Sequence, residues 1–165
     1  MAIHPDIPSM LQESLPEMLL TAKYCIEFQK DTEAWPASGC YGYPAALLLL
    51  SIADSIGSYI EKGNVQNHFK IFKNAEYYGL TLTNTEIQTL YDNYRNLLSH
   101  NSVIATNVIL NIGCATDSVI QQHNGSYLLN LVPLYNSSVK AVQVFLSNPQ
   151  VLINNKTIED IKKKS

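Results

Sequence analysis

Apolar residues recur every three or four positions through most of the chain, a pattern that predicts helices packed around a core. The first such run ends near Lys30. Ser14 can cap its start, with Pro16 in the first turn, where the missing N–H of proline is harmless. Residues 1–13 contain two prolines and are expected to be irregular.

The second predicted helix begins at Tyr43-Pro44 and ends at Gly63-Asn64. Its residues 45–53 are apolar on every side, so we expect this helix to be the most enclosed element of the fold. Residues 34–42 contain proline and glycine and predict the loop that connects the first two helices.

A shorter third helix is predicted over residues 65–78, with Gly79 as its C-terminal cap. Its expected inward side chains are Val65, Phe69, Phe72 and Tyr77 or Tyr78. Thr83-Asn84-Thr85-Glu86 matches a capping box and predicts the start of a fourth helix. The core-facing stripe of that helix consists of Ile87, Leu90, Tyr91, Tyr94 and Leu98.

The pattern of apolar and polar residues changes after the fourth helix. Residues 107–112 alternate like a strand, and Asn124-Gly125 predicts a type I′ turn, because both turn residues need positive φ. A small β-hairpin, with or without a third strand, is therefore expected. Asn136 or Ser137 can cap a last helix that ends at Pro149.

These elements predict a mainly α fold. We expect an up-and-down bundle of four to five helices, with the β-hairpin inserted after the fourth. A chain of 165 residues is long enough for one domain with a real core and too short for two of usual size. The expected domain spans residues 1–148, and residues 149–165 are expected to form a solvated tail.

Composition limits the function in two ways. Only 15% of the residues are charged, against about 25% in typical domains, so much of the surface is uncharged and a partner can bury part of it. The net charge of −3 and a pI near 5.7 give no global basic footprint for nucleic acid. A local groove that binds one or two phosphates remains compatible with that charge.

The three cysteines are far apart and have no neighbouring histidine at ligand spacing, so neither disulfides, a metal site nor a cofactor is expected. The N-terminus lacks the pattern of a signal peptide. The longest apolar run ends at Asp54 after about ten residues, short of the roughly 20 that a membrane helix needs. A cytoplasmic protein without a membrane segment is the simplest prediction.

The fourth helix carries the candidate chemistry. Asn96 and His100, four positions apart, lie on the face opposite its apolar stripe, and Arg95 lies at the border of that stripe. On a regular helix, the side chains of Arg95 and His100 point about 140° apart. One helix alone therefore does not close a site around both groups, and a two-fold dimer would bring them together.

The string Arg95-Asn96-Leu97-Leu98-Ser99-His100 resembles the Arg-x4-6-His motif of HEPN domains. These are small helical bundles best known as endoribonucleases of prokaryotic toxin–antitoxin, abortive-infection and CRISPR-associated systems. The resemblance covers about residues 10–148. It implies a homodimer whose motif helices meet in a shared cleft, and cleavage of RNA to a 2′,3′-cyclic phosphate and a 5′-hydroxyl.

Such cleavage needs a base for the 2′-hydroxyl, an acid for the leaving 5′-oxygen and positive charge at the phosphorane. His100 can serve the first two roles and Arg95 the third, with Asn96 orienting the substrate or His100. Ser99 and Asn101 can contact phosphate or simply end the helix. The alternative interpretation of Arg95 and His100 is a pair of helix-terminal side chains with surface partners.

Asp54 lies among apolar residues of the second helix, where a carboxylate is costly without a donor. We expect it to pair with a polar group on the helix of Arg95, and an aspartate that points to water is the alternative. His68, Lys70 and Lys73 are expected on the solvated side of the third helix, with an auxiliary phosphate contact as the alternative.

Two functions from different classes remain open. The first, which the intact motif favours, is a metal-independent endoribonuclease, either a toxin held by an antitoxin or an effector in phage defence. The second, which the low basicity favours, is a non-catalytic HEPN-like dimer that binds RNA, a nucleotide or a protein partner. The chain has no nucleotidyltransferase motif, so that activity would come from a partner.

Overall fold

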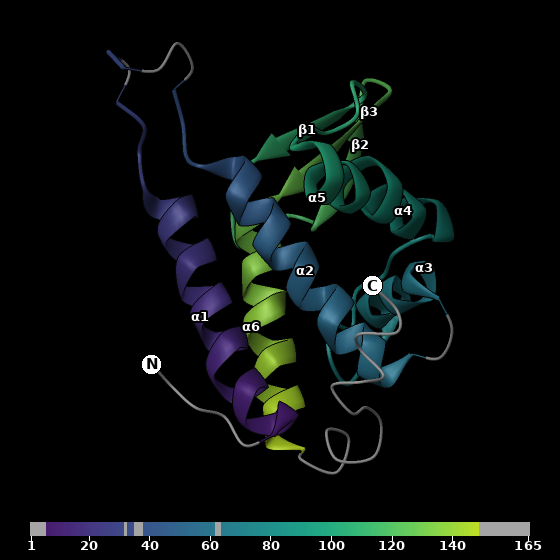
Figure 1. Cartoon of the computed structure of the whole chain (residues 1–165). Helices are drawn as coiled ribbons and strands as arrows, with labels where there is room; N and C mark the ends of the chain where they lie inside the picture. The colour runs from purple at the N-terminus through teal and green to yellow at the C-terminus, as the bar shows by residue number, and fades with distance from the viewer. Residues whose placement is uncertain (1–5, 32, 35–37, 62–63, 149–165) are drawn as a thin grey trace.

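Three long helices form the centre of the protein. The computed structural model describes residues 6–31, 33–34, 38–61 and 64–148. In it α1 (Ile7–Glu27), α2 (Gly42–Ile60) and α6 (Leu131–Ser147) lie side by side, each in contact with the other two (Figure 1). Their apolar faces meet in one core, which also takes in Phe69, Phe72, Tyr94 and Leu129 from other parts of the described fold.

Shorter elements pack against the far side of α2. They are α3 (Val65–His68), the 3₁₀ turn η1 (Phe69–Lys73), and a continuous helix made of α4 (Asn84–Thr89), η2 (Leu90–Asn96) and α5 (Leu97–Asn101). We call this continuous helix the motif helix. The predicted capping box starts it, because the Thr83 hydroxyl accepts from the Glu86 N–H and Glu86 Oε2 accepts from the Thr83 N–H.

A three-stranded sheet follows the motif helix. The strands β1 (Val108–Asn111), β2 (Ile120–His123) and β3 (Ser126–Asn130) are arranged in the order β1-β3-β2. The hairpin of β2 and β3 turns at Asn124-Gly125 with φ of 50° and 81°, as predicted, and β1 pairs with β3 in parallel. The fold is thus mainly helical with a small sheet after the motif helix, as the sequence predicted.

The start of α1 differs from the prediction. Asp6 caps the helix by accepting from the Ser9 N–H at 2.9 Å, so helical structure begins at Ile7. The expectation of an irregular segment over residues 1–13 is wrong from Ile7 onward, and residues 1–5 lie outside the described residues. Pro16 lies inside the helix, and Pro8 is in the first turn.

The predicted third helix is also wrong as a single element. Regular winding stops at His68, and η1 then continues as a tighter 3₁₀ turn. Phe69 and Phe72 are fully buried as predicted, whereas Val65 is 38% exposed. Ile71 is buried beside them, and a regular α-helix would turn it about 200° away from Phe69.

The last helix begins earlier than predicted. It follows β3 directly at Leu131, because Asn130 is buried and its side chain is bonded within the sheet region. The Asn130 amide donates to the Ser118 carbonyl and accepts from Asn111, both at 2.7 Å. Its predicted end at Pro149 and the tail over residues 149–165 lie outside the described residues.

The α2 helix is the most apolar element. Its core-facing residues Ala45, Leu49 and Ile52 are fully buried, while Leu47 and Leu48 are only half-buried. By length and composition, α2 could also cross a membrane, a test that core helices of soluble proteins pass as well.

Candidate functional site

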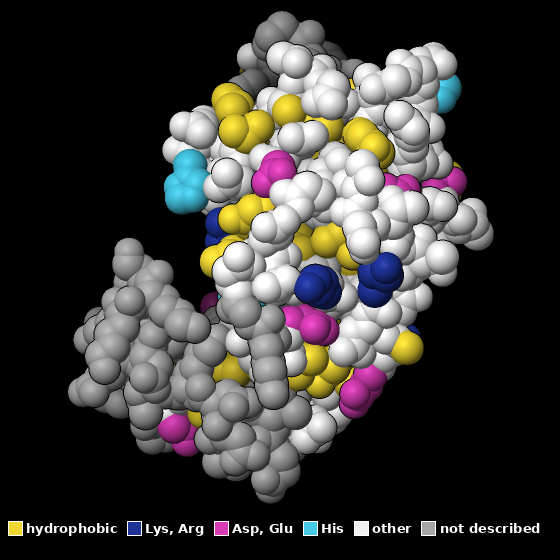
Figure 2. Space-filling model, turned by 90° about the vertical axis from the view of Figure 1, so that its right-hand side faces the viewer, with side chains coloured by type: hydrophobic (Ala, Val, Ile, Leu, Met, Phe, Trp, Pro, Cys, Tyr) yellow, Lys and Arg dark blue, Asp and Glu magenta, His cyan; other side chains and the backbone are white. Residues whose placement is uncertain are grey.

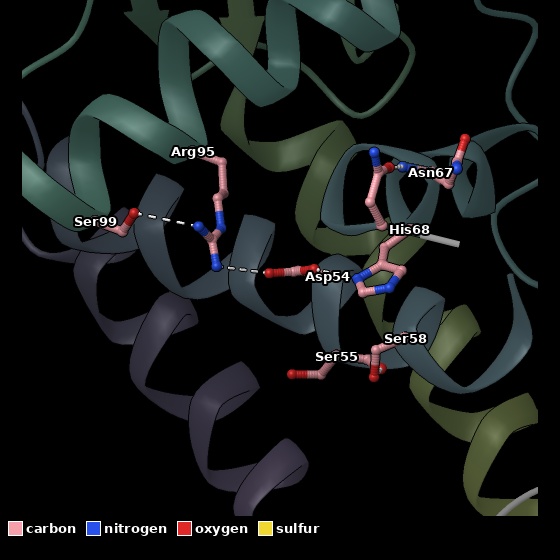
Figure 3. A network of polar contacts seen from close by, with 8 residues as sticks. Asp54, Ser55, Ser58, Asn67, His68, Arg95 and Ser99 are labelled. Carbon is pink, nitrogen blue, oxygen red and sulfur yellow. Dashed lines mark hydrogen bonds and ion pairs between the residues drawn. The ribbon is translucent and has the colours of Figure 1, made fainter. Parts of the chain in front are cut away.

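One carboxylate joins three elements of the fold. Asp54 of α2 accepts from Arg95 Nη2 of η2 at 2.7 Å on its Oδ2 and from His68 Nδ1 of α3 at 2.9 Å on its Oδ1. Figure 3 shows the carboxylate between the guanidinium and the imidazole. We call these three residues the Asp54 network. The expected pairing of Asp54 with the motif helix is therefore present.

The network is enclosed but open to solvent at its edge. The side chains of Asp54 and His68 are 15% and 12% exposed, and that of Arg95 is 22% exposed. In such surroundings a carboxylate is stabilised only by donors, and here each of its oxygens has one.

A glycine fixes the position of His68. A Cβ on Gly57, one turn after Asp54, would lie 2.2 Å from the His68 carbonyl oxygen, so α3 packs directly on the backbone of α2. The His68 backbone is thus held at Gly57 and its imidazole at Asp54. The close approach of the two backbones at Gly57 thus brings the end of α3 against α2.

The prediction for His68 is wrong. We expected a solvated side chain, but it is mostly buried and bonded to Asp54. Lys70 and Lys73 are exposed, as expected. The signal in the sequence was Asp54 itself, because an enclosed carboxylate has two oxygens that each need a donor, and Arg95 satisfies only one of them.

Arg95 is held on the side of the motif helix. Besides Asp54, it donates through Nη1 to Ser99 Oγ at 3.4 Å, a long bond, and Ser99 donates in turn to the Asn96 carbonyl at 3.2 Å. Its Nε–H is buried and has no acceptor in the described part of the chain. Two of its donor atoms are therefore free or weakly bonded.

The other predicted site residues lie along the end of the motif helix. Asn96 is half-buried, and His100 and Asn101 are exposed. No hydrogen bond or ion pair links His100 to Arg95 among residues 64–148. The structure thus brings Arg95, Asp54 and Ser99 together and leaves His100 apart from them within one chain.

Arg95 is part of a π-helical segment. The residues of η2 form a wider turn than a regular helix, and the helix returns to α geometry at Leu97. Angles read from a regular helical wheel therefore do not apply across η2. The predicted 140° between the side chains of Arg95 and His100 assumed a regular helix, which this segment does not form. Such π segments are frequent at functional sites, because the extra residue redirects a side chain.

Tyr94 connects the motif helix to the sheet. Its ring is fully buried, as the apolar stripe predicted, and its hydroxyl lies 3.2 Å from the Ile109 carbonyl of β1 and 3.0 Å from the Tyr127 carbonyl of β3. Burial raises the pKa of Tyr94 well above its ordinary value, although the backbone contacts lower it in part. This tyrosine acts as a neutral donor that fixes the rotation of η2.

The network suits the chemistry of an oriented base. A carboxylate that accepts from Nδ1 fixes the tautomer of a histidine and leaves Nε2 for another partner. A guanidinium presents a planar fork to phosphate or carboxylate oxygens. For metal binding, no group of three or more His, Cys, Asp or Glu side chains occurs in the part of the chain that the structure describes.

Comparison with known proteins found no match for this chain among protein-family models, curated proteins or solved structures. The HEPN resemblance therefore rests on the motif in the sequence alone.

Proposed function

We propose that the protein is a metal-independent endoribonuclease of the HEPN type that acts as a homodimer. The observation on which the proposal depends is the anchoring of Arg95, the arginine of the motif, by Asp54 and Ser99. A guanidinium held in place before substrate arrives loses less conformational entropy on binding phosphate. The mainly helical fold is compatible with a HEPN-like bundle.

The exposure of His100 supports a shared site. An imidazole on the last turn of the motif helix, apart from Arg95 of the same chain, can meet a second copy across a two-fold axis. In the dimer, one His100 takes the proton of the 2′-hydroxyl, whose oxygen attacks phosphorus. The same His100 then gives that proton to the leaving 5′-oxygen, and Arg95 of the other copy stabilises the phosphorane charge.

A second function is favoured by the same ion pair. The carboxylate of Asp54 neutralises Arg95 and repels a phosphate, so Arg95 can instead be a clamp that joins the motif helix to α2. In that case the protein is a non-catalytic HEPN-like dimer that binds RNA, a nucleotide or a protein partner, such as an antitoxin or a nucleotidyltransferase.

A cleavage assay in EDTA separates the two functions. We expect the wild type to cleave mixed RNA, and His100→Ala to lower the rate by about 10²-fold or more, the usual effect of removing a general acid or base. His123→Ala, a second exposed histidine in β2, is the matched control and should cleave at the wild-type rate. Absence of wild-type cleavage, or full activity of His100→Ala, would remove the catalytic proposal.

Mixing two inactive variants tests the shared site. If Arg95 of one copy works with His100 of the other, Arg95→Ala and His100→Ala chains form hybrid dimers with one intact site of two. Random exchange makes half of the dimers hybrid, so about a quarter of the wild-type activity should return. A mixture that stays inactive while hybrid dimers are present would show that the site does not combine the two copies in this way.

A further inference from the structure

Side-chain amides line a groove that begins between α3 and the motif helix and continues along the motif helix itself. It consists of two adjoining hollows of about 360 and 270 Å³ that share Asn84 and Gln88. Six of the lining residues are carboxamides: Asn64, Gln66, Asn67, Asn84, Gln88 and Asn93. We call this surface the amide groove. Its volumes lie near the lower end of the range for small-molecule sites.

The groove is polar but almost uncharged. Among the described residues, Asp92 is the one charged residue that lines the larger hollow, and Lys70 is the one that lines the smaller. Figure 2 shows the face of the molecule on which α3 and α4 lie, where uncharged polar groups cover wide areas between a few charged side chains. A ligand with many hydrogen-bonding groups and no charge of its own fits this lining better than an anion does.

The amides are ordered by contacts with one another. Gln66 Nε2 donates to Gln88 Oε1, and Gln88 Nε2 donates to Asp92 Oδ2, which joins α3 to η2 across the groove. Each primary amide has two N–H donors and an oxygen with two acceptor positions. After these contacts, Gln66 and Gln88 still have donors and acceptors to offer to a ligand in the groove.

The elements of the groove also carry the Asp54 network. Asn67 directly precedes His68 in α3, and Asp92 lies three residues before Arg95 in η2. A strand of RNA whose phosphate binds at Arg95 therefore meets the same two elements that line the groove. Amide side chains pair with the donor and acceptor edges of unstacked bases, which is how proteins recognise single-stranded RNA.

We infer that the amide groove binds the bases of single-stranded RNA through hydrogen bonds to their edges. The inference rests on the proposed function, because it takes RNA as the substrate. It assigns selection of the RNA to base contacts on α3 and α4, which are separate from the contacts of Arg95 and His100. Lys70 contributes only a contact with the phosphate backbone.

Binding of hexanucleotides to the His100→Ala protein tests this inference. The probes are ribohexamers of uridine, adenosine or cytidine and an abasic ribose-phosphate hexamer of equal charge. We expect at least one base-bearing hexamer to bind at least tenfold more tightly than the abasic one. Gln88→Ala should lower the affinity for that hexamer about tenfold and the affinity for the abasic hexamer less than twofold. Gln12→Ala, an exposed amide on α1, is the control and should change neither.

Equal affinity for base-bearing and abasic hexamers, no effect of Gln88→Ala, or no binding of any hexamer would overturn the inference. Binding of maltohexaose in place of RNA would also overturn it and assign the groove to a glycan. Cleavage by the wild type is measured separately. If hexamers bind in a base-dependent way but the wild type does not cleave RNA, only the catalytic proposal is refuted. If the wild type cleaves RNA and Gln88→Ala changes neither the rate nor the site preference, only the inference about the groove is refuted.

Discussion

The two ends of the Arg95-x4-His100 motif differ in how the rest of the chain supports them. Arg95 is bonded to Asp54 and Ser99 and lies in a π-helical turn that Tyr94 fixes to the sheet. His100, one turn further along, is exposed. The chain thus prepares one half of the motif internally and leaves the other half to whatever meets the surface. Stability should depend on the first half and activity on both.

Removing the carboxylate of the network should have the largest effect. Asp54→Ala leaves Arg95 and His68 partly buried without their acceptor, which we expect to lower the free energy of unfolding by about 3 kcal/mol or more. Urea denaturation measures the change. Glu17→Ala, an exposed carboxylate on α1, is the control and should stay within about 0.5 kcal/mol of the wild type. If the two variants changed the free energy of unfolding equally, Asp54 would not anchor Arg95 as described.

Adding a methyl group at the contact between α2 and α3 should cause the next largest loss of stability. Gly57→Ala forces the new Cβ against the His68 carbonyl, at a cost of about 2 to 3 kcal/mol after the gain in helix propensity. Gly42→Ala in the same helix is the matched control, because its Cβ would meet only ordinary contacts at 3.5 Å or more. Thermal unfolding followed by circular dichroism compares them, and a Gly57→Ala protein as stable as Gly42→Ala would refute the close approach.

Alkaline pH should weaken the protein through its buried tyrosines. Burial raises the pKa of Tyr78 far above its ordinary value near 10, although its contact with Ser138 lowers it slightly. The folded chain therefore keeps a proton that the unfolded chain releases, so stability falls as the pH rises above about 10, by up to about 1.4 kcal/mol per unit.

Urea denaturation at pH 9 to 11 tests the alkaline loss. Tyr78→Phe should flatten the decline, whereas Tyr24→Phe, at an exposed position on α1, should leave it unchanged. A decline that is the same in both variants would assign the alkaline loss to other groups.

The smallest effect on stability is expected at the exposed end of the motif. His100→Ala removes a side chain that has no partner among the described residues, so the free energy of unfolding should change by less than about 0.5 kcal/mol. Urea denaturation of the variant used for the cleavage assay provides this value. A loss above about 1 kcal/mol would show that His100 has a structural partner and would end the contrast between the two halves.

Much of the fold was predictable because it depends on local signals. The capping box at Thr83, the Asn124-Gly125 turn and the apolar stripe ending at Leu98 each follow from residues close together in the chain. The pairing of Asp54 with the motif helix was predictable for a different reason, since an enclosed carboxylate needs a donor and Arg95 offered one.

The missed features depend on contacts or on winding that no local pattern records. His68 meets Asp54 because α3 stops after one turn and packs on Gly57, and neither event has a periodic signal. The π-helical turn around Arg95 likewise leaves the apolar spacing of the motif helix almost unchanged, so a wheel drawn for a regular helix hides it. The contacts of the site therefore could not be predicted from local sequence patterns, whereas much of the scaffold could.

The packing of α6 against α1 has a consequence for synthesis of the protein. These are the first and last helices of the described fold, and Phe145 of α6 is completely buried. A nascent chain that still lacks α6 leaves the apolar sides of α1 and α2 exposed to water, so the native structure can assemble only after α6 has been synthesised. Any activity that depends on the native fold therefore begins only after the ribosome has synthesised α6.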